Sequence, residues 1–414
     1  MESFSFVKPT SIDGVSLVGV SGKLGQVVQR LHYDKPIAIE EECFIAARYS
    51  RSDKPVEDII TEIYDQSIDM SERAKKIVVD YGHSSVAEFA NVNISFEGVS
   101  ELLALFILNK IPTYAASQRS TRYQKMGTDS FVVDLPDIYS EVYEEACLEG
   151  AKYGKDAYDS IRYLLPLATR TNLWINTNLR EWARIISLLT GYTKYPEFVE
   201  TGEMIKTLLT EKINRVNPPG SYLVRHCEPH NYERDKELLS NIRACDYGER
   251  HWDLQNMSMR VWDYLVEEFT SHDYIPEWLN LFTDNLLELV LDIGQIRDWN
   301  RHRSLIRVLP LIEPIFADDT KVVIMANPEN DKVDMANPEN DKVDSEFNNF
   351  VKERLDKLLP FVDTNNLYTL PLGTQVKLFI SGPINKYLYT LLLREKEGGH
   401  TSYRNTAKEL LHRW

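Results

Sequence analysis

The stretch LPLATRTNLWINTNLREWARIISLL, residues 165–189, has a counterpart in LPLGTQVKLFISGPINKYLYTLLLR, residues 370–394. Both stretches begin with the tripeptide LPL, and the spacing from its proline to the last residue quoted is the same in each. Polar and apolar residues are also distributed in a similar way along the two stretches. These features favour a divergent tandem duplication, with a first repeat at residues 1–215 and a second repeat at residues 216–414.

The pattern of apolar residues predicts an α+β protein with substantial helix. Alternation of apolar and polar residues predicts strands at 87–96 and 375–382. Helical spacing and helix-forming residues predict helices at 101–111, 141–165, 180–191, 276–299 and 385–399. The segment NPPGSYLVRHCEPH, which starts at Asn217, interrupts this pattern with two prolines and a glycine, so it marks a boundary between domains.

The composition limits the classes of function. The chain has 43% hydrophobic residues, enough for a sizeable core, and a formal net charge of −16. Such an acidic protein lacks the broad positive field that attracts phosphate backbones, so we expect no general binding to nucleic acid or membrane. Widely spaced cysteines without a CxxC motif and the absence of a basic, apolar leader predict a reduced, cytoplasmic protein. His226, Cys227 and His230 are weak evidence for zinc, and we expect no metal.

Residues 325–344 are a perfect tandem repeat of the decapeptide MANPENDKVD. The decapeptide is polar and contains Pro, Asn and Asp, which is typical of a surface loop. We interpret it as a loop lengthened by a local duplication within the second repeat, although an artefact of the cloned sequence would give the same pattern.

Two basic clusters stand out against the acidic background. QIRDWNRHRS occupies residues 295–304, and SQRSTRY occupies residues 117–123. Arginine suits phosphate groups because its planar guanidinium donates paired hydrogen bonds and stays charged at any working pH. Taken alone, each cluster is also consistent with a polar turn or with cations at a helix end. If they bind ligands, we expect specific anion sites.

These clusters, together with GHSSVAEFANVNISFEGVSE at residues 82–101 and CFIAARYSRS from Cys43, resemble the flavin-dependent thymidylate synthases. The resemblance covers most of residues 38–200 and, more weakly, residues 285–410. It implies a fold in which each repeat has a helical segment and a mainly antiparallel sheet. It also implies transfer of a one-carbon unit to C5 of a pyrimidine deoxynucleotide, dUMP in the family, with FAD as cofactor and NADPH and methylenetetrahydrofolate as co-substrates. The family's sites lie at the subunit interfaces of a homotetramer.

The first repeat retains one part of the family's motifs. Lys110-Ile111-Pro112 stands where the family has an Arg-His-Arg triplet, Phe89 replaces a histidine, and Leu189 replaces a final arginine. The resemblance implies nucleotide binding by Ser120, Arg122 and Arg162, and flavin or folate contacts by His83, Glu88, Asn178 and Arg180.

The second repeat retains the complementary part. Its triplet, Arg301, His302 and Arg303, is intact and implies a flavin contact, and Arg394 occupies the position of the family's final arginine. The SxRY motif has become LPLIEP, and Leu367, Pro383 and Asn385 replace other family residues. We therefore expect each site to combine residues of both repeats, with Arg162 and Arg394 catalytic, in a homodimer that forms a pseudo-tetramer.

Asp298 leaves the substrate open. It replaces a family glutamine that lies near the pyrimidine, and a carboxylate could accept a hydrogen bond from an exocyclic amine. A cytosine or modified nucleotide is therefore an alternative substrate. Asp298 could equally be an ion-pair partner that orients Arg297 and Arg301. A non-catalytic scaffold that binds a nucleotide or flavin is the alternative to an enzyme.

Overall fold

A computed structural model describes much of the chain, and its compact units differ in extent from the predicted repeats. The described residues are 17–19, 29–31, 39–54, 56–66, 68, 73, 84–89, 91–110, 115–122, 124–126, 131–209, 227–246, 286–300, 305–313, 343–382, 390–391, 394 and 401–413. One compact unit contains Phe96–Trp174 and Tyr232–Trp414, and the other contains Val7–Ser95 and Ile175–Asn231. The repeats 1–215 and 216–414 stay a prediction. Residues 217–226, most of 385–399 and the decapeptides except Val343 and Asp344 lie outside the described residues.

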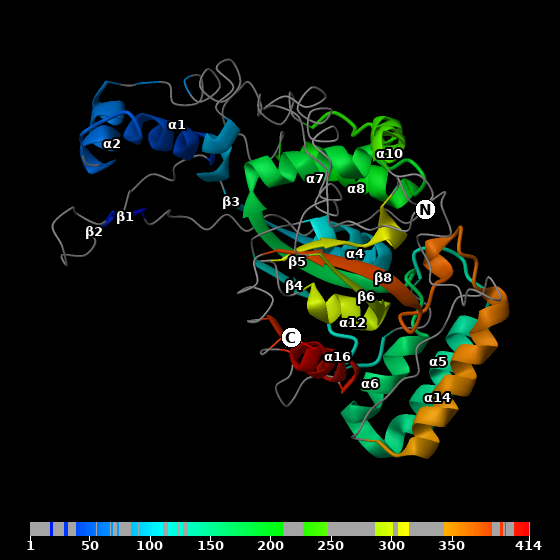
Figure 1. The fold of residues 1–414 in the computed structure, drawn as a ribbon. Coiled ribbons are helices and arrows are strands. Elements are labelled where there is room, and N and C mark those ends of the chain that lie inside the picture. The colour runs from blue at the N-terminus through cyan, green and yellow to red at the C-terminus, as the bar shows by residue number, and fades with distance from the viewer. Residues whose placement is uncertain are drawn as a thin grey trace. The chain divides into compact units, whose positions relative to one another are not determined.

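The first three-stranded sheet has the order β3-β5-β4, with β3 at Asn91–Ser100, β5 at Arg170–Asn178 and β4 at Ala115–Gln118 (Figure 1). The strand expected at 87–96 thus begins later, because Ser84–Phe89 forms a short 3-10 helix. Helix α4, Glu101–Lys110, follows β3 directly and confirms the expected helix. Nearly all its side chains are buried, which agrees with its apolar sequence ELLALFILNK.

The second sheet is antiparallel and has the order β6-β8-β7, with β6 at Leu286–Asp292, β8 at Gln375–Ser381 and β7 at Ile306–Val308. The strand predicted at 375–382 is confirmed as β8. The helix predicted at 276–299 is wrong for the residues of β6, which pair along their whole length with β8. Periodicity alone does not distinguish a short apolar strand from a buried helix, and here the partner strand decides. Helix α12, Ile293–Trp299, is confirmed.

The two LPL tripeptides pair with each other. Each donates one backbone hydrogen bond of 2.9 Å to the other, from its second leucine to the partner's first. Pro166 lies opposite Pro371 in an antiparallel bridge. Strands β5 and β8, which follow the two tripeptides, therefore occupy equivalent positions on either side of this bridge.

The two helices that follow the edge strands also begin alike. Ser100 Oγ accepts a hydrogen bond of 2.9 Å from the amide of Leu103 at the start of α4. Asp292 Oδ1 accepts one of 2.6 Å from the amide of Gln295 at the start of α12. Each side chain satisfies one of the amides that a helix start leaves without an intrahelical partner. Ser100 and Asp292 therefore occupy equivalent positions, and aligning the two helices on these caps matches each residue of α12 with one residue of α4.

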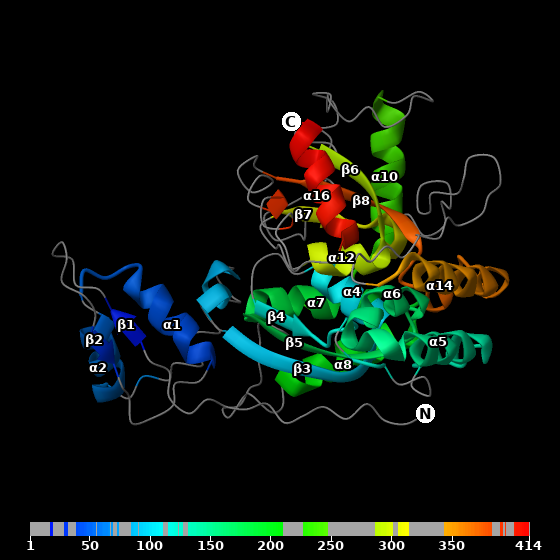
Figure 2. The same ribbon diagram turned by 90° about the horizontal axis from the view of Figure 1, so that it is seen from below.

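The helix predicted at 141–165 is interrupted. It comprises α5, Ile138–Glu149, a 3-10 segment Gly150–Ala157, α6, Tyr158–Ile161, and the 3-10 turn Arg162–Leu164. Gly154 has φ 58°, a conformation that glycine adopts without steric cost. Helix α14, Ser345–Leu358, lies beside α5 in both views (Figure 2). Arg162 begins the 3-10 turn that follows α6.

The other compact unit is helical. It contains α1, Ile39–Tyr49, α2, Val56–Asp65, α7, Leu179–Gly191, and α8, Pro196–Thr207. The predicted helix 180–191 is confirmed as α7, which packs against α8. A short hairpin pairs β1, Leu17–Gly19, with β2, Gln29–Leu31.

Two further helices belong to the first unit: α10, Tyr232–Asp246, and α16, Thr401–Arg413, which contacts α12. Within the described part of the chain, no helix is both long and apolar enough to cross a bilayer.

Candidate functional site

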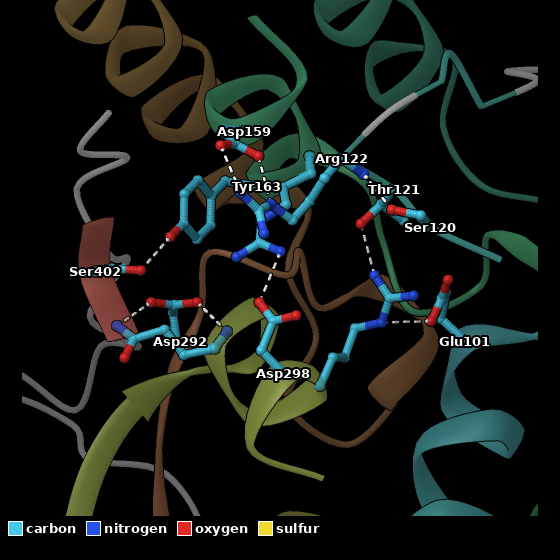
Figure 3. Close-up of polar contacts among 12 residues, drawn as sticks. Glu101, Ser120, Thr121, Arg122, Asp159, Tyr163, Asp292, Asp298 and Ser402 are labelled. Carbon is cyan, nitrogen blue, oxygen red and sulfur yellow. Dashed lines mark hydrogen bonds and ion pairs between the residues drawn. The ribbon is translucent and has the colours of Figure 1, made fainter. Parts of the chain in front are cut away.

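A pocket of about 250 Å³ lies where the segment after β4 meets α12. Its walls combine Leu108, residues 116–122, Arg162 and the residues Arg297, Asp298 and Asn300. The pocket therefore brings together two segments that are far apart in the sequence, one of which contains SQRSTRY and the other QIRDWNRHRS. Figure 3 shows Ser120, Thr121, Arg122 and Asp298 in this region.

Arg122 is anchored by a buried carboxylate. Its Nε and Nη2 donate to Asp159 Oδ1 and Oδ2 at 2.5 Å and 2.9 Å (Figure 3). Burial acts to lower the pKa of Arg122, but the hydrogen bonds and charge of Asp159 outweigh it, and the pKa is raised. Ser120 Oγ accepts a hydrogen bond from the Arg122 amide at 3.2 Å. Arg122 is thus charged and held in one orientation.

Arg162 lies deepest, with 1% of its surface exposed. Its Nη1 donates to Asp298 Oδ2 at 3.2 Å. Its Nε and Nη2 are buried and donate to no group among the described residues. Burial acts to lower the pKa of Arg162, but the surrounding acidic groups, Asp298 first, raise it above its ordinary value. Because unsatisfied buried donors are costly, these atoms point to an acceptor that binds here.

Arg297 closes the side of the pocket next to α4. Its Nε lies 3.1 Å from Glu101 Oε2, its Nη1 donates to Thr121 Oγ1 at 2.6 Å, and its Nη2 donates to the carbonyl of Arg119 at 3.2 Å. Gln118 also donates to Glu101, at 2.7 Å. Burial raises the pKa of the Glu101 carboxyl group, although the charge of Arg297 acts in the opposite direction. These contacts hold the segment after β4 against α12.

The arrangement is suited to an anion with a planar polar group. Several arginines face the pocket, and each of Arg122, Arg162 and Arg297 also faces a buried carboxylate. Such pairing fixes the guanidinium groups before a ligand arrives, which reduces the entropy lost on binding. Arg119 lines the same pocket, is only half-buried, and donates from its Nη2 to the carbonyl of Lys125 at 3.4 Å, so it adds a partly exposed cation.

The structure places four of the predicted nucleotide-binding residues, Ser120, Arg122, Arg162 and Asp298, in this one pocket. Arg394 does not line it. Its guanidinium lies 5.3 Å from the centre of the Tyr403 ring. The roles of these residues in binding and catalysis stay predictions.

The predicted flavin residues are described only in part. Asn178 begins α7 and accepts a hydrogen bond of 2.9 Å from the Glu181 amide. Arg180 Nη1 lies 2.5 Å from Glu88 Oε1, and both side chains are largely exposed. The remaining predicted residues lie outside the described residues: His83, Arg301, His302 and Arg303.

The sequence predicted Asp298 as an ion-pair partner of Arg297 and Arg301. Among the described residues, Asp298 pairs with Arg162, and Arg297 pairs with Glu101. Arg301 lies outside the described residues. Neighbouring residues on a helix point about 100° apart, so Arg297 and Asp298 face different partners.

The sequence interpretation did not identify Asp159, Glu101 and Asp292 as partners of the arginines. Asp159 precedes Arg162 by one helical turn, which is a weak signal at most. Glu101 begins an otherwise apolar helix, and a charge there is notable because so much of that helix is buried.

Lys110 has a different role from that of a flavin contact. Its Nζ lies 2.5 Å from Glu313 Oε1, with side-chain exposures of 4% and 3%. When α4 and α12 are aligned on their caps, Ser100 and Asp292, the alignment of Lys110 with the triplet shifts by one residue. Counting from these caps, Lys110 corresponds to His302, the middle residue of the triplet. Lys110 and Glu313 therefore form a buried ion pair at the position in the first repeat that corresponds to the triplet.

Comparisons with known proteins agree with the resemblance in the first half of the chain. Residues 34–213 match the family model described as thymidylate synthase complementing protein. The flavin-dependent thymidylate synthase of Thermococcus onnurineus is 28% identical over 131 residues, which cover 27% of this chain and 51% of that protein. The chain thus spans about half the length of the curated relative that it matches.

Among solved structures, the flavin-dependent thymidylate synthase of Helicobacter pylori complexed with FAD and dUMP is 15% identical, with a TM-score of 0.35. That likeness covers 46% of this chain and 95% of the other. A UMP/dUMP methylase from Streptomyces cacaoi bound with 5-Br dUMP is 17% identical, with a TM-score of 0.33, over 41% of this chain and 85% of the other. At these TM-scores, neither likeness supports a conclusion about this chain.

Proposed function

Because residues 34–213 match the family model described as thymidylate synthase complementing protein, we propose that the chain catalyses flavin-dependent one-carbon transfer to C5 of a pyrimidine deoxynucleotide. The conversion of dUMP to dTMP is the reaction that we assign. The observation that carries this proposal is the pocket around Arg162, in which an acidic protein gathers several arginines. Two buried donor atoms of Arg162, Nε and Nη2, have no hydrogen-bond partner among the described residues.

The nucleotide monophosphate is the ligand that fits this pocket. Phosphate oxygens would accept hydrogen bonds from Arg122 and Arg119, while Ser120 positions the segment that carries them. Arg162 is more deeply buried than these residues and stays charged, so its charge also favours binding of an anion. Asp298 is held by Arg162, so its position relative to the base is constrained. This constraint supports a role for Asp298 in selecting the base.

We propose further that the two repeats assemble this site together. Residues 116–122 and Arg162 belong to the first repeat, and Arg297, Asp298 and Asn300 belong to the second. The matched pairing of the two LPL tripeptides and the matched helix starts support the tandem duplication.

FAD, when bound, supplies the redox chemistry of this reaction. NADPH and methylenetetrahydrofolate are the co-substrates we assign, the first as source of reducing equivalents and the second as source of the methylene group. Arg180 can contact the flavin pyrophosphate at small cost, since an exposed pair such as Arg180–Glu88 contributes about 0–1 kcal/mol. The triplet Arg301–Arg303 and His83 complete the proposed cofactor site, and Arg394 is proposed as the second catalytic arginine.

The test is mass spectrometry of dUMP and, separately, dCMP after incubation with the protein, FAD, NADPH and methylenetetrahydrofolate. We expect dUMP to gain one methyl group. Product from dCMP alone would reassign the substrate to a cytosine nucleotide. Absence of product from both, with no bound flavin in the purified protein, would instead favour a non-catalytic scaffold.

Two variants make this test specific. Arg122→Gln removes a pocket charge and should abolish product formation. Arg354→Gln is the matched control, because Arg354 pairs with Glu145 between α14 and α5 and does not line the pocket. Light scattering of the purified protein tests the proposed homodimer.

A further inference from the structure

Asp292 is a buried carboxylate at a position where an uncharged cap would suffice. Its Oδ1 caps α12 as Ser100 Oγ caps α4, and only 2% of its surface is exposed. A serine at an N-cap is about as stabilising as an aspartate. Burial of a carboxylate is costly unless its charge is compensated. The charge at Asp292 therefore requires an explanation other than capping.

The environment of Asp292 supplies one cation. A Cβ placed on Gly294 would lie 3.0 Å from Asp292 Oδ1 and 3.5 Å from Arg162 Nη2. Both atoms thus border the same space. Arg162 Nη1 donates to Asp298 Oδ2, so the charges of both Asp298 and Asp292 act on this guanidinium.

The hydrogen-bond partners of Asp292 among the described residues are uncharged. Its Oδ2 accepts a hydrogen bond of 2.6 Å from Gln295 Nε2, and Gln295 Oε1 in turn accepts one from Thr406 of α16. Tyr163 lies beside Arg162 and contacts Ser402 of α16 at 3.0 Å. In the part of the chain that the structure describes, the titratable and charged groups that act on Asp292 are Arg162, Tyr163 and Asp298.

We infer that Asp292 is a positioning residue of the pocket: its charge state sets how much of the positive charge of Arg162 is available to an anionic ligand. The inference rests on the proposed nucleotide site. When Asp292 is ionised, its negative charge acts on Arg162 across the position of the missing Gly294 side chain, and Arg162 attracts the ligand less. When Asp292 is protonated, the pocket gains one unit of positive charge while α12 stays capped.

The pKa of Asp292 lies in a useful range. Burial raises this pKa from 3.8 to about 6, although the charge of Arg162 and the hydrogen bonds of Gln295 act to lower it. The folded protein therefore holds this proton more tightly than the unfolded chain. The resulting contribution to stability is complete below about pH 4 and is lost as the pH rises through about 6.

The experiment is isothermal titration of dUMP into the wild-type protein and Asp292→Asn at pH values from 5 to 8. The phosphate of dUMP also titrates near pH 6, so the quantity of interest is the ratio of the two Kd values, in which this common effect cancels. We expect the ratio to change on the order of tenfold over this range, as one charge roughly 10 Å from the anion predicts at an effective dielectric constant of about 20. Wild-type binding should weaken relative to the variant as the pH rises.

Two further variants separate charge from capping. Asp292→Ser reproduces the cap of the equivalent helix and should behave like Asp292→Asn. Ser100→Ala weakens the other cap and should leave the pH profile unchanged. A ratio of Kd values that is constant with pH, with or without a uniform loss of affinity, would overturn the inference and leave Asp292 as an ordinary cap. No binding of dUMP to the wild-type protein at any pH would overturn the proposed function, and this inference with it.

Discussion

The pocket and the position equivalent to it across the paired LPL tripeptides, in the proposed duplication, differ in almost every side chain. On the pocket side, Arg162 lies four residues before Pro166, and the equivalent residue before Pro371 is Leu367. Asp298 on α12 corresponds to Phe106 on α4, when the helices are aligned on their caps. A charged, hollow region on one side is therefore matched by an apolar region on the other.

The contrast extends to the segments that follow the edge strands. The amide of Arg119 donates a hydrogen bond to the carbonyl of Asn172 in β5. When the pairing of β7 with β8 is extended in the same register, Arg119 corresponds to Pro310 and Arg122 corresponds to Glu313. The intervening Pro310, Leu311 and Ile312 are buried. Glu313 pairs with Lys110, and the charge at this position is thus inverted and enclosed. In the proposed duplication, one side of the framework forms the pocket, and the equivalent side is closed by a buried ion pair.

The largest effect is expected from Arg162→Leu, which introduces the residue of the apolar side. It leaves Asp298 buried without its cation, so the free energy of unfolding should fall by about 3–5 kcal/mol. Binding of dUMP should be lost. Urea denaturation and titration calorimetry measure the two quantities. Adding Asp298→Phe, as in Phe106, should recover stability but not binding, and retained dUMP binding in the single variant would contradict the comparison.

A smaller effect is expected from Glu313→Leu on the apolar side. Lys110 then lacks its carboxylate, but a buried lysine can release its proton, so the cost should be about 2–3 kcal/mol of unfolding free energy. The affinity for dUMP should stay at the wild-type value. The double variant Lys110→Met/Glu313→Leu should restore stability in the same denaturation experiment. Loss of nucleotide binding without loss of stability would show that this side also takes part in binding.

The smallest effect is expected from Arg119→Gln. Arg119 is half-buried at the pocket and corresponds to Pro310 on the apolar side. The substitution therefore removes one positive charge that the apolar side lacks. We expect dUMP to bind roughly five- to tenfold more weakly, since a hydrogen bond to a charged group in contact with water contributes about 1–1.5 kcal/mol. The Tm should not change. An unaltered Kd in calorimetry would exclude Arg119 from the anion site.

Local patterns predicted those elements whose periodicity persists over enough residues. Helix α7 and strand β8 lie where the sequence places them because their apolar residues repeat with one clear period, and α4 does so because of its run of helix-forming residues. Strand β6 was predicted as helix, since its run of leucines fits either period and only pairing with β8 decides. The interruption after α5 was missed because Gly150 and Gly154 matter through packing and backbone conformation.

The candidate site shows the same division. The sequence identified Ser120, Arg122, Arg162 and Asp298 as residues of interest through the resemblance to the flavin-dependent thymidylate synthases. Only the tertiary structure decided which carboxylate each arginine faces, and that Lys110 is paired with Glu313. Electrostatic pairing depends on distances between residues remote in the chain, so no local pattern records it. The residue types determined which ligands are possible, and the packing of the two halves determined where one could bind.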